Sequence, residues 1–110
     1  MVKNFGQLSS GETAHLYSLM TDMLRICVTD FGGTLVSVEV KDKSGEFVDI
    51  TLGYDDVAGY ENDNDCFGFN IGRNANRISN AQFTLNNIKY VLAKNDGENN
   101  LHSGPHLFSK

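Results

Sequence analysis

Residues 72–104, GRNANRISNAQFTLNNIKYVLAKNDGENNLHSG, hold two short segments of alternating character between two polar ones. The alternating segments are Gln82–Leu85 and Ile88–Val91, and the pair Asn86-Asn87 separates them. A two-residue hairpin turn needs positive φ, which asparagine tolerates. The stretch therefore predicts a β-hairpin with a polar segment on either side.

Alternation with a period of two continues through the first half of the chain, which is typical of strands with one buried face. The segments that carry it are 14–19, 23–28, 36–40 and 48–52. The sequence Asp42-Lys43-Ser44-Gly45 predicts a turn, because glycine supplies positive φ and aspartate bonds to the local backbone. No repeat and no helix pattern of normal length is present. The predicted fold class is all-β, with antiparallel sheets.

Three other segments have weaker patterns. Residues 67–71 predict a strand in which Gly68 permits the close approach of another backbone. Residues 55–60 predict at most a short helical turn that ends at Gly59, and the polar residues 94–100 predict a loop.

The composition is that of an ordinary globular chain and excludes several classes of function. The 110 residues carry a formal net charge of -5, which disfavours binding to nucleic-acid phosphates. No apolar run approaches the roughly 20 residues of a membrane-spanning helix, and no secretory signal pattern is visible. We therefore expect no nucleic-acid or membrane partner and a cytoplasmic location, where Cys27 and Cys66 remain free thiols.

An acidic run lies in the middle of the chain and consists of Asp55, Asp56, Glu61, Asp63 and Asp65. A metal site is one interpretation, but the run lacks the glycine and glutamate positions of a calcium loop, so we expect a solvated surface and no metal ion. The glycines of the chain also lack the spacing of nucleotide-binding loops and of a serine hydrolase elbow.

The polar segments beside the hairpin contain side chains that suit hydroxyl groups. Arg77 has five donors, Asn76 has donors and acceptors, and His102 can exchange a proton near neutral pH. If the two segments converge, these residues predict a pocket for a neutral ligand rich in hydroxyls, which means a sugar. The alternative is an exposed arginine, a turn asparagine and a surface histidine that bind no ligand.

The segment GRNANRIS, followed by QFTLNNIKYVLAKNDGENNLHSG, resembles the aldose 1-epimerase (galactose mutarotase) family. That family carries a G-R-x-A-N-R-I segment, a strand hairpin and an N-x-L-H-G-G loop. Upstream, Phe5-Gly6 opens the chain, Asp30-Phe31-Gly32-Gly33-Thr34-Leu35 is similar to the family's N-Y-G-A-x-I turn, and Leu52-Gly53-Tyr54-Asp55 is similar to its L-G-Y-D segment. The resemblance follows the same order along essentially the whole chain.

Three positions depart from the family pattern. Ser103 replaces the first glycine after the histidine, Leu107 stands where a glycine is common, and Ser109 stands where an aspartate is common. The first departure is expected to affect the geometry of the loop, and the other two lie outside the positions that contact sugar in the family.

The resemblance implies a fold and a reaction. The fold is an antiparallel β-sandwich, the mutarotase-like supersandwich, and residues 1–110 would form the N-terminal part of that single domain, with the remainder of the domain as their partner. The reaction interconverts the α and β anomers of an aldohexose such as galactose or glucose. A general acid protonates the ring oxygen while a general base deprotonates the anomeric hydroxyl. The substrate is a monosaccharide, and no cofactor is implied.

The resemblance also assigns residues. Asn76 and Arg77 match the family's sugar-contacting pair, and His102 matches the loop histidine that lies beside the bound ring and supports catalysis. The family's main acid, a second histidine, and its base, a glutamate, would lie beyond Lys110. Arg73 matches the arginine that opens the motif, and we expect it to pair with a carboxylate in a structural role.

The remaining polar residues of interest are expected to be structural or exposed. Asn99 should hold the loop through hydrogen bonds from its side chain to the backbone. His15 lies in a strand far from the motifs and should be structural, and His106 should not contact ligand.

Two alternative functions stay open. An epimerase of the same fold that acts on a hexose phosphate would need further cations for the phosphate, and the only arginines are Arg25, Arg73 and Arg77, so we rank it lower. A non-catalytic sugar-binding module would keep the pocket and lack the acid and the base.

Overall fold

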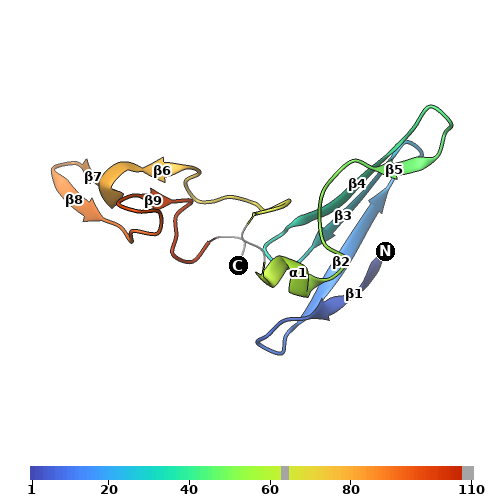
Figure 1. The fold of residues 1–110 in the computed structure, drawn as a ribbon, viewed down its shortest axis with the longest axis horizontal. Helices are drawn as coiled ribbons and strands as arrows, with labels where there is room; N and C mark the ends of the chain where they lie inside the picture. Colours follow the sequence, from blue (N-terminus) through green and yellow to red (C-terminus); the bar gives the residue numbers. More distant parts are fainter. Residues whose placement is uncertain (63–64, 108–110) are drawn as a thin grey trace. The chain divides into compact units, whose positions relative to one another are not determined.

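The computed structural model describes residues 1–62 and 65–107. The chain divides into two compact units, Met1–Asn70 and Ile71–Lys110 (Figure 1). In both units the regular elements are mainly antiparallel strands, so the predicted all-β class is confirmed. Within the part of the chain that the structure describes, no helix is long and apolar enough to cross a membrane.

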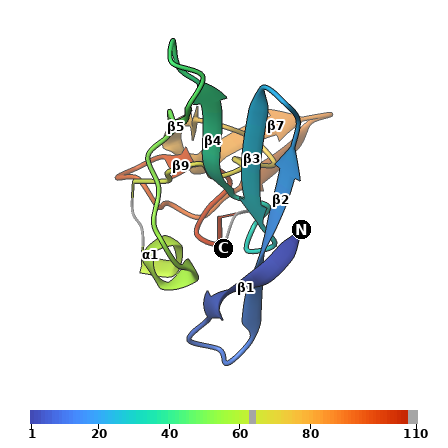
Figure 2. The ribbon, with the colours of Figure 1, turned by 90° about the vertical axis from the view of Figure 1, so that its right-hand side faces the viewer.

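The first unit is built on one five-stranded sheet in which every strand pairs with the next one along the chain. The strands are β1 Val2–Gln7, β2 Thr13–Met20, β3 Leu24–Thr29, β4 Leu35–Lys41 and β5 Phe47–Asp49. Figure 2 shows β2, β3 and β4 side by side, with a short helix, α1, near one end of the sheet. Short turns allow this up-and-down order because antiparallel neighbours need no crossover.

The core of the first unit lies where α1, Val57–Asn62, meets the sheet. Val57 and Tyr60 of the helix are fully buried against Phe5 of β1 and Leu16 of β2. Tyr54 meets Tyr60 edge to face, with ring centroids 5.1 Å apart. Burying each large apolar side chain contributes about 1.5–3 kcal/mol, so these contacts hold a six-residue helix that would not form alone.

The opposite face of the same sheet is apolar and open to solvent. The pairing of Tyr17 with Val28 and of Leu19 with Ile26 places these side chains together on that face. Tyr17 and Leu19 are exposed, as is Val48 of β5. Successive residues of a strand alternate between the two faces, so this surface is the second apolar side of a sheet suited to packing between two layers.

The helix differs from the sequence prediction at Gly59. The prediction ended the helical turn there, whereas α1 continues through Gly59 to Asn62. A Cβ at Gly59 would lie 2.4 to 2.8 Å from atoms of the Tyr54 side chain. This glycine is therefore required by close aromatic packing and not by helix termination. The Asp56 carboxylate accepts the Gly59 backbone N–H at 3.0 Å and caps the first turn.

The predicted strand at residues 67–71 is wrong, although the close approach predicted at Gly68 is present. Gly68 has φ +66°, and its carbonyl oxygen accepts the backbone N–H of Leu35 at 2.9 Å. A Cβ at Gly68 would lie 1.9 Å from the Leu35 carbonyl oxygen. The segment forms a turn because Cys66 also has positive φ and its carbonyl accepts the Phe69 N–H at 3.2 Å.

The strand predicted at 48–52 is shorter than expected and ends at Asp49. The carboxylate Oδ1 of Asp49 accepts the backbone N–H of Thr51 at 3.0 Å and its hydroxyl at 2.7 Å. The Val38 backbone N–H donates to Oδ1 of Asp49 at 3.2 Å and to the Thr51 hydroxyl at 3.3 Å, so side-chain oxygens replace the backbone acceptor that would extend the strand. At the other end of the sheet, β1 was not predicted, because its residues lack a clean alternation.

The acidic run is only partly a solvated surface. The Glu61 carboxylate accepts the Ser9 hydroxyl at 2.5 Å and the Ser9 backbone N–H at 3.0 and 3.1 Å, which ties α1 to the β1–β2 loop. Asp63 lies outside the described residues, as does Ser109 of the family motif. Among residues 1–62 and 65–107, no three His, Cys, Asp or Glu side chains gather as metal ligands would.

Cys27 and Cys66 are free, as predicted.

The second unit consists of two strand pairs. The hairpin of β7, Gln82–Leu85, and β8, Ile88–Val91, is confirmed, with φ of 50° at Asn86 and 61° at Asn87. The second pair joins β6, Arg77–Ile78, to β9, Asn100–Leu101, and a 3-10 turn at Ser79–Ala81 leads from β6 into the hairpin. This second pair brings the two polar segments together.

Candidate active site

The pairing of β6 with β9 places the three predicted residues next to one another. Arg77 is opposite Leu101, and Ile78 is opposite Asn100. In an antiparallel pair, the residue that precedes one strand lies beside the residue that follows the other. Asn76 therefore lies beside His102, although 26 positions separate them in sequence.

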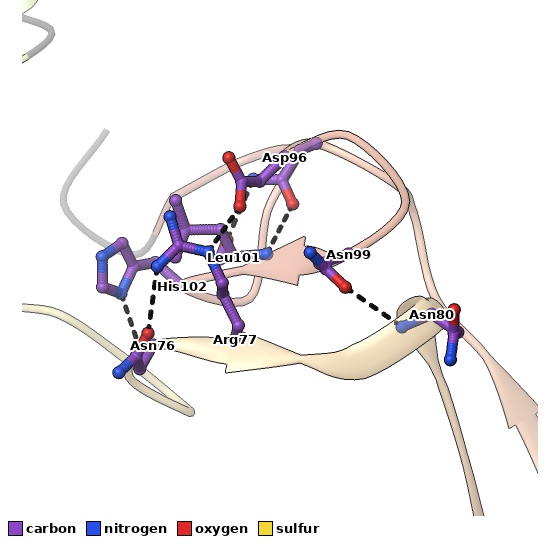
Figure 3. A network of polar contacts seen from close by, with 8 residues as sticks. Asn76, Arg77, Asn80, Asp96, Asn99, Leu101 and His102 are labelled. Carbon is purple, nitrogen blue, oxygen red and sulfur yellow. Dashed lines mark hydrogen bonds and ion pairs between the residues drawn. The ribbon is translucent and has the colours of Figure 1, made fainter.

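Asn76 and His102 hold each other through two hydrogen bonds (Figure 3). The backbone N–H of His102 donates to the Asn76 carbonyl oxygen at 3.0 Å. The backbone N–H of Asn76 donates to the ring Nδ1 of His102, also at 3.0 Å. A nitrogen that accepts a hydrogen bond carries no proton, so this contact assigns the neutral ring proton to Nε2. His102 then offers an N–H donor at its other nitrogen.

Arg77 is held by a carboxylate that the sequence prediction missed. Its Nε donates to Oδ2 of Asp96 at 2.5 Å, and its Nη1 donates to the Asn76 side-chain oxygen at 3.4 Å. The Arg77 side chain is 53% exposed and that of Asp96 is 35% exposed. Figure 3 shows the Asp96 carboxylate turned toward the guanidinium. The ion pair offsets the charge of Arg77 and leaves part of its donor edge accessible.

Asparagines build the loop that carries His102. The Asn95 side chain bonds to Leu101 in both directions, donating to the carbonyl at 2.9 Å and accepting the N–H at 2.7 Å. The buried Asn100 donates to the carbonyls of Ala93 at 2.8 Å and Gly104 at 2.9 Å. These contacts satisfy backbone groups that have no strand partner. The density of asparagine in residues 95–100 was the only sequence signal of this scaffold.

Asn99 has the role that the sequence predicted. Its side-chain oxygen accepts the backbone N–H of Asn80 at 3.2 Å, which ties the loop to the turn after β6.

Ser103, which departs from the family pattern, also has a structural role in this loop. Ser103 has φ +62°, and its hydroxyl accepts the Asn74 N–H at 2.9 Å and donates to the Asn74 carbonyl at 3.2 Å. The serine thus adds a second tie between the two motifs at a position whose backbone favours glycine.

Arg73 and His106 line a hollow together with Ser103, the residue that follows His102. This hollow has a volume of about 330 Å³, and the three predicted site residues are not among its lining residues. Within residues 1–62 and 65–107, Arg73 makes no ion pair, so the predicted pairing with a carboxylate is not found there.

His15 is structural, as predicted, and belongs to the first unit. Its backbone N–H donates to Oδ1 of Asp30 at 2.8 Å, and its ring Nδ1 lies 3.0 Å from Oδ2. Partial burial raises the pKa of the Asp30 carboxyl, but the hydrogen bonds and the charge of His15 outweigh it. The pKa of Asp30 is therefore lower than the ordinary value of 3.8.

The side chains at the β6–β9 junction form a set of donors that is close to neutral. The Nε2–H of His102 and the remaining guanidinium N–H groups of Arg77 are donors, and the Asn76 amide adds both kinds of group. Such a set matches hydroxyl and ether oxygens better than it matches an anion, because Asp96 already offsets the arginine. That all three line one pocket remains a prediction.

Comparison with known proteins supports the same family along the chain. The family model for aldose 1-epimerase matches residues 15–108. The chain is 41% identical to galactose mutarotase of Bos taurus over 107 residues, which cover 96% of the chain and 31% of that protein. It is 35% identical to aldose 1-epimerase of Streptococcus thermophilus over 100 residues, 91% of the chain and 29% of that protein. The chain thus spans about 31% of the length of the curated relatives it matches first.

Two solved structures share the fold. An aldose epimerase homologue from C. elegans superposes with a TM-score of 0.81 at 30% identity, over 87% of this chain and 30% of that one. The galactose 1-epimerase of Lactobacillus acidophilus superposes with a TM-score of 0.82 at 23% identity, over 99% of this chain and 31% of that one. The chain therefore has the fold of part of their antiparallel sandwich, as predicted. By the match over residues 15–108 and by this shared fold, the chain belongs to the aldose 1-epimerase family.

Proposed function

We propose that the whole protein is an aldose 1-epimerase that interconverts the α and β anomers of an aldohexose such as galactose or glucose. We include in the proposal that Asn76, Arg77 and His102 contact the sugar. The observation that carries it is the double hydrogen bond between Asn76 and His102, which joins the two polar segments at the residue before Arg77. Family membership supports the reaction, and this geometry supports the residues.

The reaction requires a proton to reach the ring oxygen as another leaves the anomeric hydroxyl, so that the ring opens to an aldehyde and closes on the other face. His102 fits a supporting role in this exchange. Its Nε2–H can donate to a sugar oxygen and stabilise charge that develops there. Its Nδ1 already accepts the Asn76 N–H, so taking up a proton at that nitrogen would break the contact that positions the ring. The main acid and base would come from other parts of the protein.

Arg77 fits the role of a binding residue. A guanidinium has five N–H groups in a fixed plane and no acceptor, so it can donate to two neighbouring hydroxyl oxygens at once. With Nε engaged by Asp96, the donors that remain are those at the end of the side chain. The Asn76 amide can both donate a hydrogen bond to a sugar hydroxyl and accept one from it, and a hydroxyl group can likewise donate and accept.

Polarimetry of freshly dissolved α-glucose and α-galactose with the whole protein tests the proposal. We expect the decay of rotation to be faster than in buffer alone. His102→Ala should reduce kcat/KM by roughly 10- to 100-fold, the loss of about 1–3 kcal/mol expected for a donor to a developing charge. His106→Ala is the matched control, because His106 lies on the same loop and outside the proposed site.

Three results would contradict parts of the proposal. Decay at the buffer rate would contradict the enzyme assignment, and sugar binding without faster decay would favour a non-catalytic sugar-binding module. Equal loss of activity in the His102 and His106 variants would contradict the role of His102.

A further inference from the structure

Asp96 lies at the candidate site, where hydrogen bonds hold both its backbone and its carboxylate. Its backbone N–H donates to the Asn99 carbonyl oxygen at 3.2 Å, and its own carbonyl oxygen accepts the Asn99 N–H at 2.9 Å. Gly97, with φ +57°, lies in the turn that these bonds close. The backbone of Asp96 is thus fixed by a tight turn, and its carboxylate is directed at Nε of Arg77 at 2.5 Å.

This contact sets the orientation of the guanidinium. An arginine side chain turns freely about several bonds, and holding it in one geometry costs entropy when it binds a ligand. The bond at Nε, together with the longer one from Nη1 to Asn76 at 3.4 Å, uses two of the five N–H groups. The other three, all at the end of the group, make no hydrogen bond within the described part of the chain. Asp96 therefore presents the outer edge of Arg77 to a ligand.

The contact also sets the charge of the site. The second carboxylate of the same turn, Glu98, pairs with Lys94 and is not used by Arg77. Asp96 and Arg77 together carry no net charge, so the guanidinium acts as a source of hydrogen bonds and not as a free cation. An anionic sugar would gain less from such a pair than from an unpaired arginine, because the carboxylate repels it.

We propose that Asp96 is a positioning residue that orients the guanidinium of Arg77 and offsets its charge, and thereby makes the site prefer a neutral sugar to an anionic one. This inference rests on the proposed function and adds a residue and a specificity to it. It also gives a physical reason why an epimerase for hexose phosphates is the weaker alternative.

The test compares kcat/KM for α-glucose and for α-glucose 6-phosphate in the whole protein. In Asp96→Asn, KM for glucose should rise about fivefold to tenfold with little change in kcat, because an oriented donor is lost before the chemical step. The ratio of kcat/KM for glucose to that for glucose 6-phosphate should fall by about tenfold. Asp96→Glu, which keeps the charge, should restore most of this ratio.

Glu98→Gln is the matched control, since it removes a paired carboxylate from the same turn without touching Arg77. Its ratio should equal that of the wild type. A second measurement follows the Nε–H signal of Arg77 by NMR, assigned by its loss in Arg77→Lys. Exchange of this proton with water should be slow in the wild type and should become faster in Asp96→Asn.

The outcomes separate this inference from the proposed function. One outcome is that the wild type accelerates anomer exchange while Asp96→Asn lowers kcat/KM equally for glucose and for glucose 6-phosphate. In that case Asp96 has only a structural role and the inference is wrong. If the Nε–H signal exchanges equally fast with and without the Asp96 carboxylate, the inference is wrong whatever the activity. A wild type that leaves anomer exchange at the buffer rate contradicts the proposed function, and the NMR comparison still decides whether Asp96 orients Arg77.

Discussion

The imidazole Nδ1 of His102 accepts the backbone N–H of Asn76 at 3.0 Å, and both residues have positive φ, 53° and 64° respectively. A main-chain donor cannot rotate away from the ring as a side chain can. The contact therefore fixes both the direction of the histidine and the nitrogen that carries its proton. Two strands of only two residues each provide this arrangement.

The tautomer of His102 can be measured directly. We expect two-bond nitrogen–proton NMR spectra of the whole protein at neutral pH to show Nδ1 unprotonated and Nε2 protonated, because Nδ1 accepts a hydrogen bond. His106 in the same spectra provides an internal reference without this contact in the structure. A His102 ring with its proton on Nδ1 would contradict the assignment and the supporting role built on it.

Replacement of Arg77 tests how strongly it contributes to binding. Arg77→Ala should cost about 1–3 kcal/mol in kcat/KM, because donors to the sugar hydroxyls are lost. Arg77→Lys should recover only part of this, since an ammonium group lacks the planar fork and cannot repeat the geometry at Asp96. The measurement is the rate of mutarotation of galactose over a range of concentrations. Wild-type kinetics in both variants would mean that Arg77 serves only to anchor Asp96.

Ser103 combines an unfavourable backbone with a favourable hydroxyl. Ser103→Ala keeps the Cβ at φ +62° and loses the two bonds to Asn74, so it should destabilise the fold by about 1–2 kcal/mol. Ser103→Gly loses the same bonds but removes the strain, and its stability should lie within about 1 kcal/mol of the wild type. Urea unfolding of the whole protein gives both values. A glycine variant less stable than the alanine variant would show that the strain is absent.

The contact between His15 and Asp30 predicts a dependence of stability on acidity. The pKa of Asp30 in the folded chain is lower than the ordinary 3.8, so its contribution to stability is complete above that pH. The contribution is lost as the pH falls through the lowered pKa. Asp30→Asn should therefore flatten the fall in the urea midpoint below pH 3.8, while Asp22→Asn serves as a surface control. Parallel curves for wild type and Asp30→Asn would contradict the shift.

Residues 1–110 studied alone should bind a hydrophobic dye and self-associate. The apolar side chains on the open face of the first sheet, among them Leu19 at 65% exposure, have no layer over them in the described structure. The polarimetric rate should equal that of buffer, because the proposed acid and base are not among these residues. Anilinonaphthalene sulfonate fluorescence measures dye binding, and light scattering measures self-association. Leu19→Lys is expected to reduce both signals. A monodisperse and catalytically active chain would show that His102 and its neighbours suffice.

Local chemistry predicted much of this fold, and tertiary contacts decided the rest. The turn at Asn86-Asn87 and the strands around Leu16, Ile26 and Val38 were predictable, because turn residues and alternation act within a few positions. The extent of α1 was not, since the role of Gly59 depends on the Tyr54 ring that packs on it.

The candidate site was predictable in its residue types but not in its connections. Asn76, Arg77 and His102 were identified from their motifs, whereas β6 and β9 are too short to leave a pattern of their own. The sequence predicts Asp96 only as part of a polar loop, because nothing in the local sequence shows that its carboxylate contacts Arg77. Pairing between segments about twenty residues apart becomes visible only in three dimensions.

The aromatic packing in the core has a consequence for optical spectroscopy. The chain has no tryptophan and four tyrosines, so tyrosine dominates its absorption and fluorescence in the near ultraviolet. Tyr60 is fully buried beside Tyr54 in the first unit, while Tyr90 stacks on Phe83 in the second, with centroids 5.0 Å apart. Each unit thus contains its own chromophore in a fixed environment. In residues 1–110, near-ultraviolet circular dichroism of a Tyr90→Phe variant would leave tyrosine signal from the first unit alone, and the difference from wild type would report the melting of the second.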